Sequence, residues 1–218
     1  MREVVAHETP FGRVAVLEDM VQRAHILLND TTWHGWQFRD PDRLDEPAGY
    51  YSAASPIAEL FRALSPRARV AVVGLGAGVM ASLGAPGHTI DFYELNPAVV
   101  EVARDASLFS YLARTRSRCE VIVGDAVERI TEAPARAYDL IAIDAFNGDE
   151  VSGAVLSREA VARFVSRLAS GGVIAYHITS TSRGDDHRPA IARAAERMAC
   201  AYKDGRSPRL AHDSSLEI

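Results

Sequence analysis

Residues 70–78 read Val-Ala-Val-Val-Gly-Leu-Gly-Ala-Gly, and this stretch decides the fold. Its four leading apolar residues predict a buried strand, and the glycines predict a tight turn into a helix that begins near Val79. A second apolar strand at 89–93 ends in Glu94, twenty residues after Gly74. Strand, glycine turn, helix, strand and acid in this order predict a βαβ unit that binds a nucleotide.

The spacing of the glycines indicates which kind of nucleotide is bound. Gly74, Gly76 and Gly78 let a ligand approach the backbone, but the dinucleotide pattern needs a small residue where this chain has Val79. Pyrophosphate is therefore disfavoured. Glu94 lies where a carboxylate can accept both hydroxyls of a ribose. The motif favours an adenosyl ligand without phosphate, such as S-adenosylmethionine (SAM) or decarboxylated SAM; a turn that binds nothing is the alternative.

Length and composition indicate one α/β domain with a small appendage. The chain has 218 residues, nearly half of them apolar, without a run long enough to span a membrane. Its first residues lack the apolar stretch of a signal peptide, so we expect a cytoplasmic protein. The two cysteines, far apart in sequence, indicate neither a disulfide framework nor a metal site. A net charge of −5 disfavours nucleic-acid binding and would tolerate a cationic substrate.

Strands and helices alternate from residue 69 onward, which predicts a Rossmann-like, doubly wound, mainly parallel sheet with helices on both faces. We expect strands at 70–73, 89–93, 119–123, 140–143 and 173–178, and helices at 78–84, 97–106, 126–132 and 158–168. Ser55 before Pro56 predicts the start of an earlier helix. Residues 3–37 instead predict a small antiparallel sheet, with β segments at 3–8, 12–18 and 23–28. We assign residues 1–48 to this β-hairpin domain with its linker, and 49–218 to the SAM-binding domain.

The carboxyl ends of the parallel strands carry the candidate functional residues, because these ends meet at one edge of the sheet. Asp125 follows the third strand, where it can accept the exocyclic amine of an adenine; capping the next helix is the alternative. Asp144 ends an apolar strand and is the candidate catalytic residue. It can orient an amine, accept its proton and stabilise positive charge beside a sulfonium carbon. Further candidates are His34, Tyr50, Tyr51, Asn147, Asp149 and His177.

The order of these motifs resembles the spermidine synthase (polyamine aminopropyltransferase) family from about residue 3 to residue 179. Thr9-Pro-Phe-Gly12 is similar to the N-terminal hairpin of that family, and residues 27–37 are similar to its turn, which ends in a donor-contacting glutamine. Gly49-Tyr-Tyr51 resembles the tyrosine segment before the first domain helix. Residues 138–144 resemble the strand that carries the catalytic Asp.

The resemblance implies a SAM-type donor, a small-molecule amine acceptor and a role for each matching residue. It puts Gln37, Glu94 and Asp125 on the nucleoside and Asp144 on the attacking amine. The full set assigned to cofactor binding is Gln37, Gly74, Gly76, Ala77, Gly78, Glu94, Leu95, Asp125 and Ala126. The set assigned to substrate binding is Tyr50, Tyr51, Asn147 and Asp149. We also expect a homodimer, and no membrane or nucleic-acid partner.

Two departures from the family pattern bear on the reaction. The family has an acid at the position of Ala77, which helps to hold the amine tail of decarboxylated SAM and would repel the carboxylate of SAM. Ala77 therefore favours SAM, as does the apolar residue at this position in plant putrescine N-methyltransferases. The polyamine synthases also carry a second acid at the position of Asn147. Its loss near a diamine would cost on the order of 1 kcal/mol.

These features support three hypotheses. The first is an enzyme that transfers the methyl group of SAM to an amine, with Asp144 helping to deprotonate it. The second is an aminopropyltransferase that uses decarboxylated SAM. The third is a non-catalytic module that keeps the nucleoside site.

The family fold closes with a helix, here at 189–198, and two antiparallel strands. We expect the first strand at 201–203 and the second to be short, supplied by a partner or absent.

Overall fold

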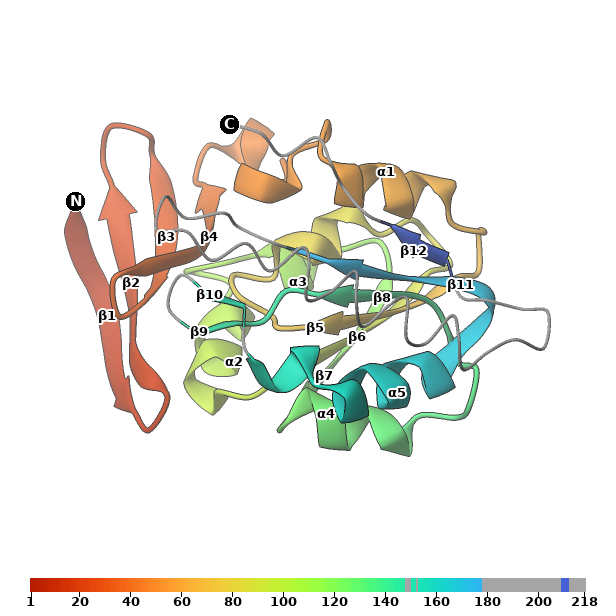
Figure 1. The fold of residues 1–218 in the computed structure, drawn as a ribbon. Helices are drawn as coiled ribbons and strands as arrows, with labels where there is room; N and C mark the ends of the chain where they lie inside the picture. The colour runs from red at the N-terminus through yellow and green to blue at the C-terminus, as the bar shows by residue number, and fades with distance from the viewer. Residues whose placement is uncertain (148–149, 152, 178–208, 212–218) are drawn as a thin grey trace.

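The computed structural model describes residues 1–147, 150–151, 153–177 and 209–211. The strands of this part of the chain form two main sheets, one with four antiparallel strands and one with six parallel strands (Figure 1). A short ladder joins β9 (Phe146–Asn147) to β10 (Glu150–Val151). The predicted fold class, a Rossmann-like sheet preceded by a small antiparallel sheet, is confirmed.

The antiparallel sheet contains one strand more than the sequence predicts. Its strands follow chain order: β1 (Arg2–Thr9), β2 (Gly12–Asp19), β3 (Ala24–Asn29) and β4 (Thr32–Phe38). The first three match the predicted β segments. The fourth lies where we expected a turn that ends in Gln37. Gly35, with φ +125°, and a register shift between Ile26 and Leu28 interrupt the β3–β4 ladder, so the sequence of β4 gives a weak strand signal.

The parallel sheet has the order β12-β11-β8-β5-β6-β7. Its strands are β5 (Arg69–Val73), β6 (Thr89–Glu94), β7 (Arg118–Val123), β8 (Tyr138–Ile143), β11 (Leu168–Tyr176) and β12 (Arg209–Ala211). The chain moves outward from β5 to β7 and then returns to the other side of β5, so the order reverses between β5 and β8. Ligands of open α/β sheets bind at such a switch point. The strand β12 was not predicted, and the predicted elements at 189–198 and 201–203 lie outside the described residues.

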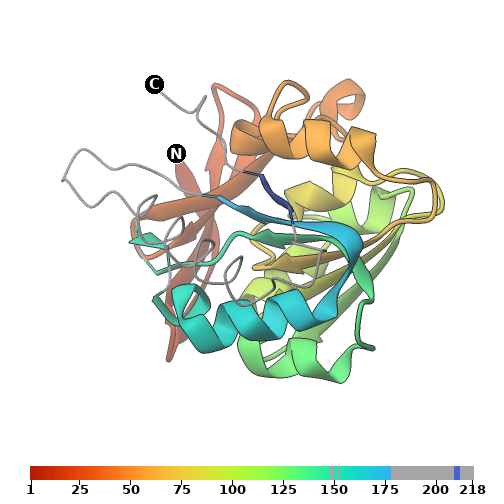
Figure 2. The same ribbon diagram turned by 45° about the vertical axis from the view of Figure 1, so that its right-hand side comes forward.

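Helices cover both faces of the parallel sheet, as Figure 2 shows for α1 and α5. One face carries α1 (Pro56–Ala63), η3 (Val79–Leu83), α2 (Pro97–Arg104) and α3 (Tyr111–Arg114). The other carries α4 (Ala126–Arg129), η4 (Ile130–Glu132) and α5 (Arg158–Arg167). The short helices η1 (Pro41–Arg43), η2 (Gly49–Tyr51) and η5 (Gly153–Leu156) lie in connecting segments. Among the described residues, no helix is long and apolar enough to cross a membrane.

The helix starts follow the sequence signals, with one difference. Ser55 caps α1 by accepting the N–H of Ala58, with Pro56 as the first helical residue, as predicted. The helix expected at 78–84 is only the short 3₁₀ helix η3. Gly78 precedes it at φ +81°. The glycine turn therefore leads into a single tight turn of backbone instead of a long α-helix.

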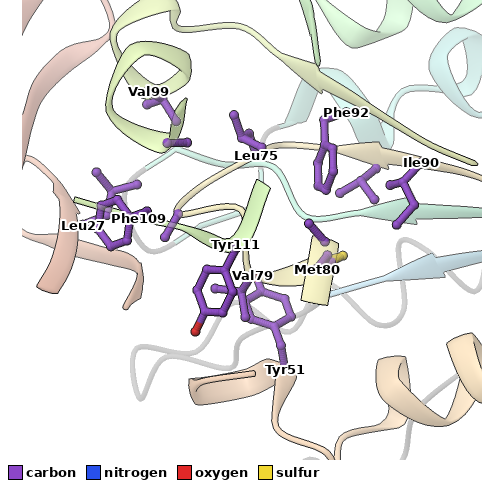
Figure 3. Close-up of a cluster of buried hydrophobic side chains, with 14 of the residues drawn as sticks. Leu27, Tyr51, Leu75, Val79, Met80, Ile90, Phe92, Val99, Phe109 and Tyr111 are labelled. Atoms are coloured by element: carbon purple, nitrogen blue, oxygen red, sulfur yellow. The ribbon is translucent and has the colours of Figure 1, made fainter. Parts of the chain in front are cut away.

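The two sides of the sheet bury separate cores, because side chains alternate along each strand. Val70 and Val72 of β5 face the α1–α2 side, and Ala71 and Val73 face the α4–α5 side. The first core also takes in the antiparallel sheet: Leu27 of β3 is fully buried beside Phe109 (Figure 3). The antiparallel sheet is thereby packed onto the carboxyl-terminal edge of the parallel sheet.

At the switch point the backbones of β5 and β8 approach very closely. The N–H of Asp144 donates to the carbonyl of Val73 at 2.8 Å, and Gly74 follows at φ +98°. A Cβ atom on Gly74 would lie 2.2 Å from the carbonyl oxygen of Asp144. Only glycine combines this backbone conformation with this separation. The first glycine of the motif therefore sets how close the two strand ends can be.

The effect of this contact on stability can be measured. Gly74→Ala introduces both an unfavourable φ and a clash with backbone, whereas Gly171→Ala, at φ +80° with no described atom within 4 Å of the added Cβ, introduces only the first. We expect Gly74→Ala to lower the free energy of unfolding by about 1 to 3 kcal/mol more than Gly171→Ala does. Urea denaturation of the two variants measures the difference, and equal losses would contradict a steric limit at Gly74.

Candidate functional site

A cavity of about 690 Å³ lies over the carboxyl ends of the parallel strands, between them and the antiparallel sheet. From the parallel domain it is lined by the loops after β5, β6, β7, β8 and β11. From the antiparallel sheet it is lined by the β1–β2 turn, which contains Phe11, and by the β3–β4 turn together with Trp33 and His34 at the start of β4. Tyr50 and Tyr51 of η2 close a further side. The cavity thus coincides with the switch point and combines residues from both sheets.

The loops that line the cavity begin with a shared backbone pattern. After each of four strands, the first loop residue donates its N–H to a carbonyl of the last or penultimate residue of the neighbouring strand. These bonds join Gly74 to Tyr93 and Gly124 to Glu94 at 2.8 Å, Asp144 to Val73 at 2.8 Å, and His177 to Ile143 at 2.9 Å. The sheet ladder therefore continues for one residue into the site, and it holds the first residue of each loop as rigidly as a strand residue.

The glycine turn after β5 is pressed between the two sheets. Gly76 has φ +53°, and a Cβ atom there would lie 2.4 Å from the carbonyl oxygen of His34. The N–H of Ala77 donates to that same carbonyl at 3.3 Å. Gly74, Leu75 and Gly76 line the cavity. Their backbone is therefore open to a ligand on one side and held against β4 on the other.

Glu94 lies at the end of β6 with its carboxylate in the cavity wall. One oxygen accepts the N–H of Leu75 at 2.9 Å and the other accepts the N–H of Asn96 at 2.8 Å. Burial raises the pKa of Glu94 above its usual value, and the backbone donors only partly offset that effect. Each oxygen keeps a second lone pair, so the ionised carboxylate can still accept two hydroxyl groups.

Asp125 caps a helix and also lines the cavity. Its side chain caps α4, with Oδ1 accepting the N–H of Val127 at 2.7 Å. The residue also lines the cavity, as do Ala126 and the half-exposed Leu95. Because one carboxylate oxygen is enough for the cap, the other can accept a hydrogen bond from a ligand. The capping role and the ligand role are compatible.

Three residues assigned to cofactor binding do not line the cavity. Gln37 is 3% exposed; its amide donates to the Leu44 carbonyl and to Ser110 Oγ, and it accepts the N–H of Ser110. Ala77 is 1% exposed and packs against Gly35 of β4. Gly78 forms the cap of η3. In this structure these residues hold β4 and the glycine turn in position, and they lie behind the cavity wall.

Asp144 is held by two side chains from other parts of the chain. Tyr51 of η2 donates its hydroxyl to Oδ2, and His177, directly after β11, is bonded through Nδ1 to Oδ1 at 2.7 Å. The Asp144 and His177 side chains are only 13% and 15% exposed. Burial, followed by the neighbouring charge of Asp144, raises the pKa of Tyr51 well above its usual value. Tyr51 is therefore protonated at neutral pH and can donate its hydroxyl to Asp144.

Two tyrosine rings lie beside the imidazole of His177. The ring of Tyr50 lies 5.1 Å from that of His177, and the ring of Tyr51 lies 6.1 Å from it, measured between centroids. Tyr50 is half exposed at the cavity and Tyr51 is buried. Asn147 belongs to β9, just beyond Asp144, and Asp149 lies outside the described residues. This end of the cavity therefore brings together one carboxylate, one imidazole and two phenols.

The sequence named His177 and His34 only as further candidates and assigned them no role. Both line the cavity. The predicted strand at 173–178 contained His177, whereas β11 ends at Tyr176, so the sequence did not identify His177 as a strand-end residue like Asp144. Phe11 and Trp33 also line the cavity, and nothing in their local sequence indicated this. Within the described part of the chain, no group of three or more His, Cys, Asp or Glu side chains could hold a metal ion.

Sequence comparison finds one informative relative. No family model matches the chain. A polyamine aminopropyltransferase from Vibrio vulnificus (strain CMCP6) is 33% identical over 131 residues, which cover 58% of this chain and 42% of that protein. The chain thus spans less than half the length of this curated relative.

Structural comparison finds spermidine synthases. The crystal structure of spermidine synthase from Thermotoga maritima has a TM-score of 0.61 at 14% identity, covering 91% of this chain and 64% of that one. A probable spermidine synthase from Corynebacterium glutamicum has a TM-score of 0.65 at 14% identity, covering 99% of both chains. These comparisons confirm the resemblance predicted from the motifs: the chain has the Rossmann-like fold of the spermidine synthases and is similar in sequence to a polyamine aminopropyltransferase.

Proposed function

We propose that this protein is an enzyme that transfers the aminopropyl group of decarboxylated SAM to a small amine. The observation that carries the proposal is the single cavity that joins two chemically different halves. One half contains the glycine turn, Glu94 and Asp125; the other contains Asp144 with its two donors. A nucleoside donor and an amine acceptor need these two sets of groups next to each other.

The first half fits an adenosyl group. Gly74 and Gly76 present backbone without side chains, so a ligand can lie against the turn. Glu94 has lone pairs left for ribose hydroxyls, and Asp125 has an oxygen left for an exocyclic amine. In this half, the described cavity wall consists of carboxylates and main-chain groups. Carboxylates would repel a pyrophosphate, so the wall suits a donor that has a nucleoside but no pyrophosphate.

The second half fits an attacking amine. An ammonium group must lose a proton before its nitrogen can attack the carbon beside the sulfonium. The carboxylate of Asp144 can anchor the ammonium and stabilise the positive charge at the reacting centre. When the new N–C bond forms, the C–S bond breaks and its electron pair neutralises the sulfur, leaving methylthioadenosine. Orientation supplies most of the rate enhancement, because the donor is already activated.

Aminopropyl transfer has more support than methyl transfer, which was our first hypothesis from the sequence. That hypothesis depended on Ala77 as the residue that selects the donor. Ala77 packs against Gly35, behind the cavity wall, so its side chain is not in a position to select between donors. The sequence relative is named a polyamine aminopropyltransferase. We therefore propose a diamine such as putrescine as the acceptor. The homodimer and the cytoplasmic location stay predictions.

The donor and the role of Asp144 can be tested together. With decarboxylated SAM and putrescine, we expect mass spectrometry to detect spermidine and methylthioadenosine, and calorimetry to show tighter binding of decarboxylated SAM than of SAM. Asp144→Asn should lower kcat by about 100-fold or more, because the amide cannot anchor the ammonium by charge. Its Kd for methylthioadenosine should stay within about threefold of the wild type, because Asp144 belongs to the acceptor half.

The matched control is Asp42→Asn, the same substitution at an exposed residue of η1 outside the cavity. It should leave kcat unchanged. Methylated product from SAM would contradict aminopropyl transfer, and nucleoside binding without any turnover would favour the non-catalytic module. Full activity of Asp144→Asn would remove Asp144 from the mechanism.

The raised pKa of Glu94 predicts how donor binding depends on pH. Its carboxylate must be ionised to accept ribose hydroxyls, and burial raises its pKa above that of an ordinary glutamate. Affinity for methylthioadenosine should therefore fall as the pH is lowered, and the fall should begin at a higher pH than an unperturbed glutamate would cause. Calorimetric titrations from pH 8 to pH 4 measure this dependence. The Glu94→Gln variant should bind methylthioadenosine more weakly at pH 8, and its affinity should no longer depend on pH in this way. If the variant keeps the pH dependence, another group is responsible for that dependence.

A further inference from the structure

We propose that His177 is the proton acceptor of this reaction, with Asp144 as the group that orients its imidazole. The inference rests on the proposed function, because it assigns the base for the same transfer. It starts from the fact that the two side chains form a bonded pair in the cavity wall, contributed by adjacent parallel strands. Sequence reasoning assigned the proton to Asp144 itself.

The backbone fixes the position of His177. Strands β8 and β11 pair in register up to Ile143 and Tyr176, and the N–H of His177 then donates to the carbonyl of Ile143 at 2.9 Å. Asp144 is anchored in the same way to Val73. The two side chains therefore start from adjacent, rigid positions at one edge of the sheet. The Nδ1–Oδ1 distance of 2.7 Å follows from that placement.

This hydrogen bond determines the tautomer of the imidazole. An ionised carboxylate can only accept, so Nδ1 must carry the proton that it donates to Asp144. In the neutral ring the basic atom is then Nε2, which lies on the side of the ring away from Nδ1. Tyr51 donates to the other oxygen of Asp144, so the carboxylate is bonded through both oxygens and cannot rotate freely. A carboxylate that fixes a histidine tautomer and stabilises the imidazolium is an established arrangement for general-base catalysis.

The groups that face His177 suit a site that handles positive charge. Asp144 contacts it from β8, and Tyr50 and Tyr51 pack against it from η2. Glu94, at the end of β6, lines the same cavity, and its pKa is raised mainly by burial and to a smaller extent by the charge of Asp144. The described contacts of His177 thus include one carboxylate and two phenol rings, and a second carboxylate lines the same cavity. Such surroundings stabilise both a bound ammonium and the imidazolium formed from it.

The proposed step conserves atoms and charge. The acceptor ammonium gives one N–H proton to Nε2, which leaves a neutral amine and an imidazolium paired with Asp144. The amine nitrogen then forms a bond to the propyl carbon beside the sulfonium, and the electron pair of the broken C–S bond goes to sulfur. The new secondary ammonium leaves with the positive charge. His177 afterwards releases its proton to solvent.

The decisive variant is His177→Gln. A glutamine amide can still donate an N–H toward Asp144, but it cannot take up a proton. With decarboxylated SAM and putrescine we expect kcat to fall by about 100-fold or more, while the Kd for methylthioadenosine stays within about threefold. The remaining rate should rise continuously toward roughly pH 10, where amines lose their proton unaided. His7→Gln, on β1 outside the cavity, is the matched control and should keep the wild-type kcat.

A second variant tests the base directly. His177→Ala should regain part of the lost rate when imidazole is added, because the free base can enter the vacated volume and take the proton. This recovery should be absent for Asp144→Asn, in which His177 is still present. Thermal unfolding of each variant checks that it is folded before its rate is compared.

The outcomes separate this inference from the proposed function. If the wild type forms spermidine and His177→Gln keeps kcat and the pH profile, His177 only positions Asp144 and the inference is wrong, while aminopropyl transfer stands. If His177→Ala loses activity that imidazole does not restore, the proton acceptor is another group. If the wild type forms no product from either donor, the proposed function fails, and the inference fails with it.

Discussion

The close approach of β5 and β8 at the switch point is the constraint on which the rest of the site depends. Gly74 leaves no room for a side chain next to the carbonyl of Asp144, and the N–H of Asp144 is bonded to Val73. This contact brings the glycine turn and the Asp144 carboxylate to the same edge of the sheet. Parallel strands place loop residues of distant sequence side by side only when their ends are in register. Gly124 and His177 are anchored by equivalent backbone bonds.

The antiparallel sheet completes the cavity through backbone contacts more than through catalytic groups. The carbonyl of His34 receives the N–H of Ala77, so β4 holds the glycine turn from behind. At the other side, Asn96 donates to Thr9 at 3.1 Å and its own N–H is bonded to Glu94. The β1–β2 turn is thereby tied to the residue that we propose for the ribose. The small sheet thus shapes the nucleoside half, and its rim residues Phe11 and Trp33 form part of the wall.

Sequence reasoning succeeded where a signal is local and failed where a contact is distant. Apolar runs ended by glycine or an acid located β5, β6, β7 and β8, and they put Glu94, Asp125 and Asp144 at or just beyond the ends of the last three. It failed for β4, because Gly35 and a register shift disturb the alternation. The family motifs assigned Gln37 and Ala77 to cofactor binding, but motifs report sequence position and not the direction of a side chain. Both are buried against neighbouring segments instead.

The sequence by itself determined the βαβ unit, the class of ligand it suits and the strand ends that carry acids, because period-two burial and glycine turns are properties of adjacent residues. Only the tertiary structure decided which of these residues meet. Tyr51, Asp144 and His177 come from three separate segments, and their contact depends on strand order and on the packing of η2 over the sheet edge. No local pattern encodes that contact, because its parts are brought together by the fold as a whole.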